Sequence, residues 1–143
     1  MKRAISAIIL LFVLNGCNEQ TNDPASIDPY EQWRSYKLHD YTIEQIRVCY
    51  CATGGDKMTV TVRSDTVFSV VRISDSTVVP YPTSKLYFSV DSLFGIIQHP
   101  KGDSLVIVYN AQYGFPEKLD INPQEHPVDG GVLYETNNLQ PKK

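Results

Sequence analysis

Residues 57–73, which read KMTVTVRSDTVFSVVRI, decide the fold class. Lys57 to Arg63 alternates apolar and polar side chains, and Thr66 to Ile73 is again rich in β-branched and aromatic residues. Only Ser64-Asp65, a pair of turn-forming residues, separates the two runs. Because so short a connection leaves no room for a crossover helix, the runs predict two antiparallel strands.

Four more segments on either side of this hairpin have the period of two that is typical of strands. One precedes it at Tyr41 to Cys51, and three follow at Ser104 to Tyr109, Glu117 to Asn122 and Val132 to Thr136. Between the two groups, Ser74 to Thr83 contains two prolines and is expected to be a loop.

Two segments have the helical period instead. Asp28-Pro29 offers an N-cap and a first-turn proline, which predicts a helix from Pro29 to Leu38. Ser89 can cap a second helix from Val90 to Gln98. The order αβββαβββ predicts an α+β domain, with two short helices packed on one face of a largely antiparallel sheet of about six strands. The core candidates are Trp33, Val60, Val62, Leu93, Phe94, Val106 and Val108.

The first 17 residues have the pattern of a bacterial lipoprotein signal. Met1-Lys2-Arg3 is followed by the apolar run Ala4 to Leu14, which is too short for the roughly 20 residues of a membrane span. Leu14-Asn15-Gly16-Cys17 resembles the lipobox, in which signal peptidase II cuts before a cysteine that carries a diacylglycerol thioether. We therefore expect residues 1–16 to be removed and Cys17 to anchor the protein to a membrane.

The processed chain is expected to have a polar flexible tether at residues 17–27 and a single domain at residues 28–143. Loss of Lys2 and Arg3 leaves 11 basic against 16 acidic residues, a net charge of −5. A negative domain without a Lys/Arg cluster argues against nucleic acid as a partner. The expected location is the cell envelope. Asn18 replaces the aspartate that retains lipoproteins at the inner membrane in enteric-type sorting, so the outer membrane is favoured in a cell that has one.

With Cys17 assigned to lipid, Cys49 and Cys51 remain as a pair in an oxidising compartment. In a regular strand, side chains two residues apart are separated by about 6.6 Å, whereas a disulfide needs Cβ atoms about 3.5 to 4.5 Å apart. A bond would therefore require an irregularity at Tyr50. The pair could be a redox couple or a soft ligand for Cu(I) or Zn(II). We favour a local disulfide or two small buried residues, because no further His or Cys lies at metal-ligand spacing.

No catalytic motif of useful specificity is present: the chain lacks G-x-S-x-G, H-E-x-x-H and a phosphate-binding glycine loop. Asp120 and Asp129 are the nearest candidates for paired acid–base catalysis, but positions in turns and at strand edges explain them more simply. The remaining candidates for metal ligands are His39, His99 and His126, which are scattered and more typical of surface histidines. We expect no cofactor, no metal site and no catalytic residue.

Several short motifs, taken together, are similar to those of a family of bacterial lipoproteins that carry a domain of unknown function. The matching features are Trp33, Cys49-Tyr50-Cys51, Asp91-Ser92-Leu93-Phe94, Val108-Tyr109-Asn110 and Tyr113-Gly114-Phe115-Pro116, within residues 33–129. Family members tend to carry an aspartate where this chain has Asn110, and an acidic cluster where Asp129 is followed by Gly130-Gly131. The resemblance implies an envelope location and leaves the activity open.

The leading hypothesis is a non-catalytic envelope lipoprotein that binds an envelope protein or another envelope component through an exposed sheet face or edge strand. The alternative is a thiol-redox or soft-metal-binding protein that uses Cys49 and Cys51.

Overall fold

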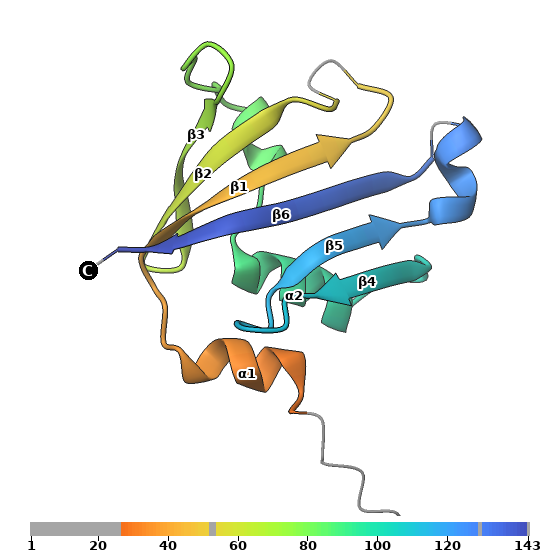
Figure 1. Ribbon diagram of the computed structural model, residues 1–143. Helices are drawn as coiled ribbons and strands as arrows, with labels where there is room; N and C mark the ends of the chain where they lie inside the picture. The colour runs from red at the N-terminus through yellow and green to blue at the C-terminus, as the bar shows by residue number, and fades with distance from the viewer. Residues whose placement is uncertain (1–26, 52–53, 129, 143) are drawn as a thin grey trace, which may run out of the picture.

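The computed structural model describes residues 27–51, 54–128 and 130–142 (Figure 1). The first half of the chain contains α1 (Pro29–Ser35), β1 (Tyr41–Val48), β2 (Lys57–Arg63) and β3 (Thr66–Arg72). The second half contains η1 (Thr83–Leu86), α2 (Val90–Gln98), β4 (Leu105–Tyr109), β5 (Pro116–Ile121), η2 (Pro123–Val128) and β6 (Val132–Pro141). Apart from the two 3-10 helices η1 and η2, this is the predicted order αβββαβββ.

The six strands form one open antiparallel sheet in the order β3-β2-β1-β6-β5-β4. Each half of the chain makes a meander of three strands, and the halves meet where the first and last strands pair. In that central pair Gln45 of β1 lies opposite Thr136 of β6, and Arg47 lies opposite Tyr134. The predicted α+β class and the predicted antiparallel sheet are therefore confirmed.

One face of the sheet carries the hydrophobic core. Tyr41 and Ile43 of β1 are buried, and Thr42 between them is only partly covered. Trp33 of α1 and Phe94 of α2 belong to the same buried cluster as these strand residues. The confirmed core candidates are Trp33, Val60, Val62, Leu93 and Phe94, all of them at most 2% exposed.

The helix α1 begins where the sequence predicts and ends earlier. Asp28 accepts hydrogen bonds from the backbone amides of Tyr30 and Glu31, at 2.9 and 3.1 Å, as an N-cap should. The helix was expected to reach Leu38 but ends at Ser35. Lys37 has φ of 51°, which lies outside the right-handed helical region and turns the chain toward β1.

The helix α2 has the predicted bounds and is fixed to the sheet at its first turn. The Ser89 hydroxyl accepts a hydrogen bond from the Ser92 amide at 3.2 Å, and the Val90 amide donates to the Tyr41 hydroxyl at 2.9 Å. Burial raises the pKa of Tyr41, so the phenol remains neutral. The hydroxyl of a core residue of β1 therefore positions the start of α2.

Gln45 is a polar residue inside the core, and its side chain is fully buried. Its amide oxygen accepts a hydrogen bond from the Phe88 amide at 3.0 Å, and its amide nitrogen donates to the Thr136 hydroxyl at 3.2 Å. Because buried polar groups are costly when they are unpaired, these bonds hold β1, β6 and the segment before α2 in one arrangement.

The prediction of core positions is wrong for two residues of β4. Val106 and Val108 are 51% and 49% exposed, whereas Ile107 between them packs against the core. Every residue of β4 from Leu105 to Tyr109 is apolar or aromatic. Alternation therefore cannot show which of its two sides faces inward.

The larger remaining differences from the sequence prediction concern the ends of the first and last strands and the expected loop after β3. The strand expected to reach Cys51 ends at Val48, because the chain bends at the two cysteines. The last strand, expected to end at Thr136, continues to Pro141, which pairs with Tyr41 at the far end of β1. The expected loop Ser74 to Thr83 contains an isolated bridge between Val78 and Val71 of β3.

Candidate functional site

The face of the sheet opposite the core carries a row of paired residues that crosses four strands. Val48 of β1 lies opposite Leu133 of β6, Leu133 opposite Asp120 of β5, and Asp120 opposite Val106 of β4. Figure 1 views the sheet from this side, with α2 behind the sheet and α1 beyond one end of it. Neither α-helix therefore covers this outer face in the described part of the chain.

A second row lies beside the first. It runs from Ile46 of β1 through Glu135 of β6 and Lys118 of β5 to Val108 of β4. The two rows combine aliphatic side chains with charges of both signs, a composition that suits contact with another protein. The two most exposed valines of these rows, Val106 and Val108, lie on β4 at the border of the sheet, and Val48 of β1 is exposed as well.

The strand β4 is an open edge. One of its sides pairs with β5, and among the described residues no strand pairs with the other. The opposite edge, β3, is partly covered, because the Val79 amide donates to the Val70 carbonyl oxygen at 2.8 Å. An unpaired edge presents backbone donors and acceptors to which another chain can bind.

The cysteine pair forms the second candidate site. Cys49 and Cys51 are joined by a disulfide, with Cα atoms 5.3 Å apart, just beyond the end of β1. The Cys51 amide donates to the Cys49 carbonyl oxygen at 2.9 Å, which supplies the bend at Tyr50 that the geometry of a strand requires. Gly54 closes the turn, and a Cβ at this position would collide with the Cys49 carbonyl oxygen.

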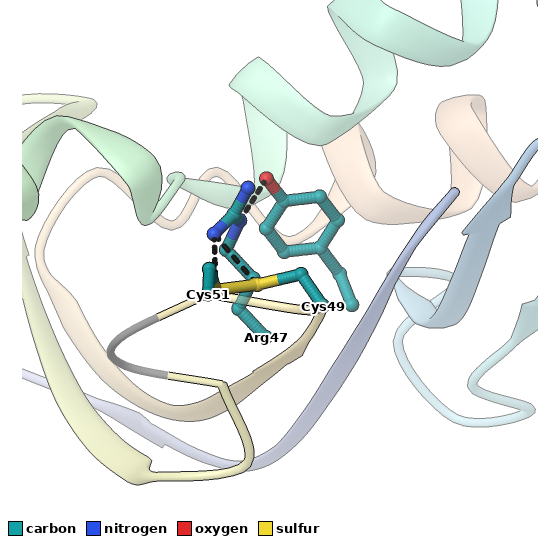
Figure 2. Close-up of a disulfide and its surroundings, with 4 residues drawn as sticks. Arg47, Cys49 and Cys51 are labelled. Carbon is teal, nitrogen blue, oxygen red and sulfur yellow. Dashed lines mark hydrogen bonds between the residues drawn. A yellow bond between two sulfur atoms is a disulfide. The ribbon is translucent and has the colours of Figure 1, made fainter. Parts of the chain in front are cut away.

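A guanidinium group lies directly against this disulfide (Figure 2). Arg47 Nη1 lies 2.8 Å from Cys49 Sγ and 3.0 Å from Cys51 Sγ, and Arg47 Nε donates to the Tyr134 hydroxyl at 3.2 Å. Burial raises the pKa of Tyr134, so its neutral hydroxyl is kept as an acceptor. A cation in this position stabilises a thiolate whenever the disulfide opens.

Sequence reasoning did not select Arg47, although a signal for it was present. Residues two apart in a strand point to the same face, so an arginine two positions before Cys49 is placed on the side of the cysteines. The role of Tyr134 could not be found in this way, because it depends on the pairing of β1 with β6.

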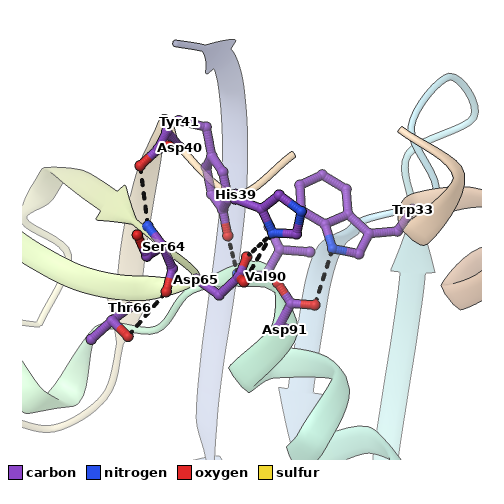
Figure 3. A network of polar contacts seen from close by, with 9 residues as sticks. All are labelled: Trp33, His39, Asp40, Tyr41, Ser64, Asp65, Thr66, Val90 and Asp91. Carbon is purple, nitrogen blue, oxygen red and sulfur yellow. Dashed lines mark hydrogen bonds and ion pairs between the residues drawn. The ribbon is translucent and has the colours of Figure 1, made fainter. Parts of the chain in front are cut away.

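An open depression of about 290 Å³ lies at the opposite end of β1, and Figure 3 shows the polar contacts of several residues that line it. His39 Nδ1 lies 2.9 Å from Asp65 Oδ2, and Trp33 Nε1 donates to Asp91 Oδ1 at 3.4 Å. Burial raises the pKa of the Asp91 carboxyl. These contacts connect α1, the start of β1, the β2–β3 turn and the start of α2. The polar contacts in this depression therefore have a structural role, because they join these elements.

The other residues considered in the sequence lie apart from one another. His99 Nδ1 lies 3.2 Å from the Gly95 carbonyl oxygen, and His126 Nε2 lies 2.8 Å from Asp120 Oδ1. Asp120 is thus paired with a histidine, while its expected partner Asp129 lies outside the described residues, as does Cys17.

Asn110 shapes the β4–β5 connection. Its side-chain oxygen accepts hydrogen bonds from the amides of Gln112 and Tyr113, at 3.0 and 2.7 Å, and its amide nitrogen donates to Glu117 at 2.7 Å. Gln32 of α1 in turn donates to the Gln112 carbonyl oxygen at 2.9 Å. The residue that differs from the resembling family therefore has a structural role in docking α1.

The described residues contain neither a cluster of metal ligands nor a membrane-spanning helix. Residues 27–51, 54–128 and 130–142 contain no group of three or more His, Cys, Asp and Glu side chains that could hold a metal ion. Nor do these ranges include a helix with the length and apolar character needed to span a membrane.

Comparison with known proteins places most of the chain in one family. The model of a family of unknown function, DUF6174, matches residues 28–141, which include every helix and strand described above. No curated protein and no solved structure matches the chain. On this evidence the chain belongs to DUF6174, a family of unknown function.

Proposed function

We propose that this protein is a lipid-anchored component of the bacterial cell envelope whose domain binds an extended segment of an envelope protein along β4. The anchor is supported by the signal pattern that ends at Cys17. The observation that carries the binding role is the open edge of β4, where Val106 and Val108 are about half exposed.

The chemistry of β4 suits the addition of a strand. Natural edge strands are commonly protected by lysine, proline or a bulge, yet Leu105–Tyr109 contains no charged residue and no proline. Its one irregularity lies between Val108 and Tyr109, at the end of the strand. The backbone from Leu105 to Val108 is thus the available template, and main-chain hydrogen bonds along it would supply affinity.

The side chains around β4 define the partner. A strand added beside β4 would place alternate side chains next to Val106 and Val108, so its outward residues should be apolar. Lys118, on the neighbouring strand β5, offers a positive charge to the rim of the contact, whereas Asp120 is already paired with His126. The net charge of −5 expected for the processed chain disfavours nucleic acid. Main-chain pairing along β4 calls for a protein segment as the partner.

Site-specific photo-crosslinking in cells tests the binding role. A photoreactive residue replaces Val106 in the full-length protein, and the matched control replaces Val78, an exposed valine beside the opposite edge. The expected result is a discrete adduct with one envelope protein from position 106 and none from position 78. The adduct should disappear when Val108 is also changed to proline. Equal labelling at both positions, or no adduct at 106, would contradict strand addition at β4.

The anchor has a separate test. The protein made in its host should partition into detergent and show the mass of a chain that begins at a lipid-modified Cys17. A Cys17→Ser variant should keep its leader and lack the lipid. Recovery of unmodified wild-type protein in the aqueous phase would rule the anchor out, and fractionation of the two membranes would test the outer-membrane location.

A further inference from the structure

We infer that the disulfide between Cys49 and Cys51 is a thiol–disulfide exchange site for cysteine-containing peptide segments, in which Cys51 is the attacked sulfur and Cys49 the leaving thiolate. The inference is independent of the proposed binding along β4. It rests on the unequal exposure of the two cysteines, on the guanidinium beside them and on the position of the turn (Figure 2).

The two sulfurs differ in accessibility. Cys51 is exposed, whereas Cys49 is half-buried. Tyr50, the residue between them, is 89% exposed. An incoming thiolate therefore reaches Cys51 first, and Tyr50 offers an apolar contact to the chain that carries it.

Arg47 is placed to stabilise the leaving group. Its Nη1 lies 2.8 Å from Cys49 Sγ, a hydrogen-bonding distance that a thiolate strengthens because the contact then joins opposite charges. Exchange is faster when the leaving thiol has a low pKa, and a neighbouring arginine lowers a thiol pKa. The Tyr134 hydroxyl holds the guanidinium in place through Nε. Arg47 thus contacts the leaving sulfur directly, and Tyr134, which acts through Arg47, is a positioning residue.

The position of the turn makes it accessible. The cysteines lie just after the last residue of β1, and α1 lies before its first residue. The eight residues of β1 therefore separate the disulfide from the point where the chain enters the domain (Figure 1). At about 3.3 Å per residue this separation is roughly 26 Å. The disulfide therefore lies at the end of the sheet far from the entry of the tether, where an envelope protein can reach it.

The exchange conserves atoms and electrons. A substrate thiolate attacks Cys51 Sγ, a mixed disulfide forms, and the bond to Cys49 breaks with its electron pair on Cys49 Sγ, beside Arg47. A second substrate thiolate then attacks the substrate sulfur of the mixed disulfide and releases Cys51. Two electrons and two protons have passed from the substrate dithiol to the cysteine pair. A small-molecule disulfide, which is itself reduced to two thiols, oxidises the pair again.

The first test follows the exchange itself. The full-length Cys17→Ser variant has Cys49 and Cys51 as its only cysteines. It is kept in non-ionic detergent and treated with reduced glutathione. The reaction is then quenched with acid, and the modified cysteine is identified by mass spectrometry. Glutathione should be found on Cys51. Arg47→Met should slow the exchange by about threefold or more, the effect of roughly one unit of thiol pKa. Arg47→Lys should retain part of the rate.

The matched control is Arg63→Met, because Arg63 lies over the Phe68 ring and far along β2 from the cysteines. This variant should exchange at the wild-type rate, and circular dichroism should show all variants folded. A disulfide that resists glutathione in the folded protein, glutathione found on Cys49, or an Arg47→Met rate equal to that of Arg63→Met would each overturn the inference.

The second test separates an exchange activity from a structural brace. A reduced peptide with two cysteines is incubated with glutathione disulfide, with and without catalytic amounts of the Cys17→Ser protein. The protein should accelerate closure of the peptide disulfide, and Cys51→Ala should abolish the acceleration. Equal rates with and without the wild-type pair would overturn the inference. The Val106 crosslink should persist in the Cys51→Ala variant, so failure of either proposal can be recognised alone.

Discussion

Replacement of Gln45 by methionine should destabilise the domain strongly although the two side chains have similar volumes. In the native protein the Gln45 amide bonds the Phe88 backbone amide at 3.0 Å and the Thr136 hydroxyl at 3.2 Å, in a site that excludes solvent. Methionine fills the space without leaving a large cavity, but it can satisfy neither partner.

The magnitude follows from the two groups left unpaired. A buried donor or acceptor without a partner costs about 1 to 3 kcal/mol, so the loss at Phe88 and Thr136 together is about 2 to 6 kcal/mol. For a urea m value of about 1.5 kcal/mol per M, a loss of about 3 kcal/mol lowers the urea midpoint by about 2 M. Removal of one orphaned group by Thr136→Val should recover about 1 kcal/mol of this loss in the Gln45→Met background.

Urea unfolding at 25 °C, followed by Trp33 fluorescence, measures these differences. The matched control is Gln140→Met, because Gln140 is an exposed glutamine on β6 whose replacement should change stability by less than about 0.5 kcal/mol. If the free energy of unfolding of Gln45→Met lies within about 0.5 kcal/mol of the wild type, or if Thr136→Val adds to its loss, the hydrogen bonds of Gln45 do not stabilise the core.

Three further predictions concern the core, the turn beside α1 and the depression. Leu119→Ala should lower the free energy of unfolding by about 2 to 5 kcal/mol because Leu119 is fully buried, whereas Val106→Ala should lower it by less than about 1 kcal/mol. Urea midpoints that rank the two variants in the opposite order would reverse the assigned faces of the sheet. Gly114→Ala should lower the thermal midpoint by several degrees, because φ is +80° and the added Cβ would collide with the Pro29 carbonyl oxygen; an unchanged midpoint would show that α1 moves freely. Burial raises the pKa of Asp91 above its ordinary value of 3.8, so its protonated form stabilises the fold, and this contribution is lost as pH rises through the raised pKa. The free energy of unfolding of Asp91→Asn, relative to wild type, should therefore increase from pH 3 to pH 7, and a constant difference would contradict the role given to burial.

Local patterns determined the elements whose ends are set by local chemistry. The β2–β3 hairpin has its predicted partners because Ser64 and Asp65 fix the turn, both with positive φ. The bounds of α2 follow from the cap at Ser89. The cysteine pair could also be chosen from sequence, since two residues so close in the chain remain close in any fold.

Tertiary structure alone decided the features that depend on distant pairing. Nothing local states that β1 and β6 adjoin, and this pairing brings Tyr134 to Arg47, covers Gln45 and extends β6 to Pro141. The orientation of β4 was equally hidden, because both of its sides are apolar and only its register with β5 turns Val106 outward. Short-range periodicity encodes the alternation of a strand, whereas the side that becomes buried depends on which other surfaces of the molecule pack against it.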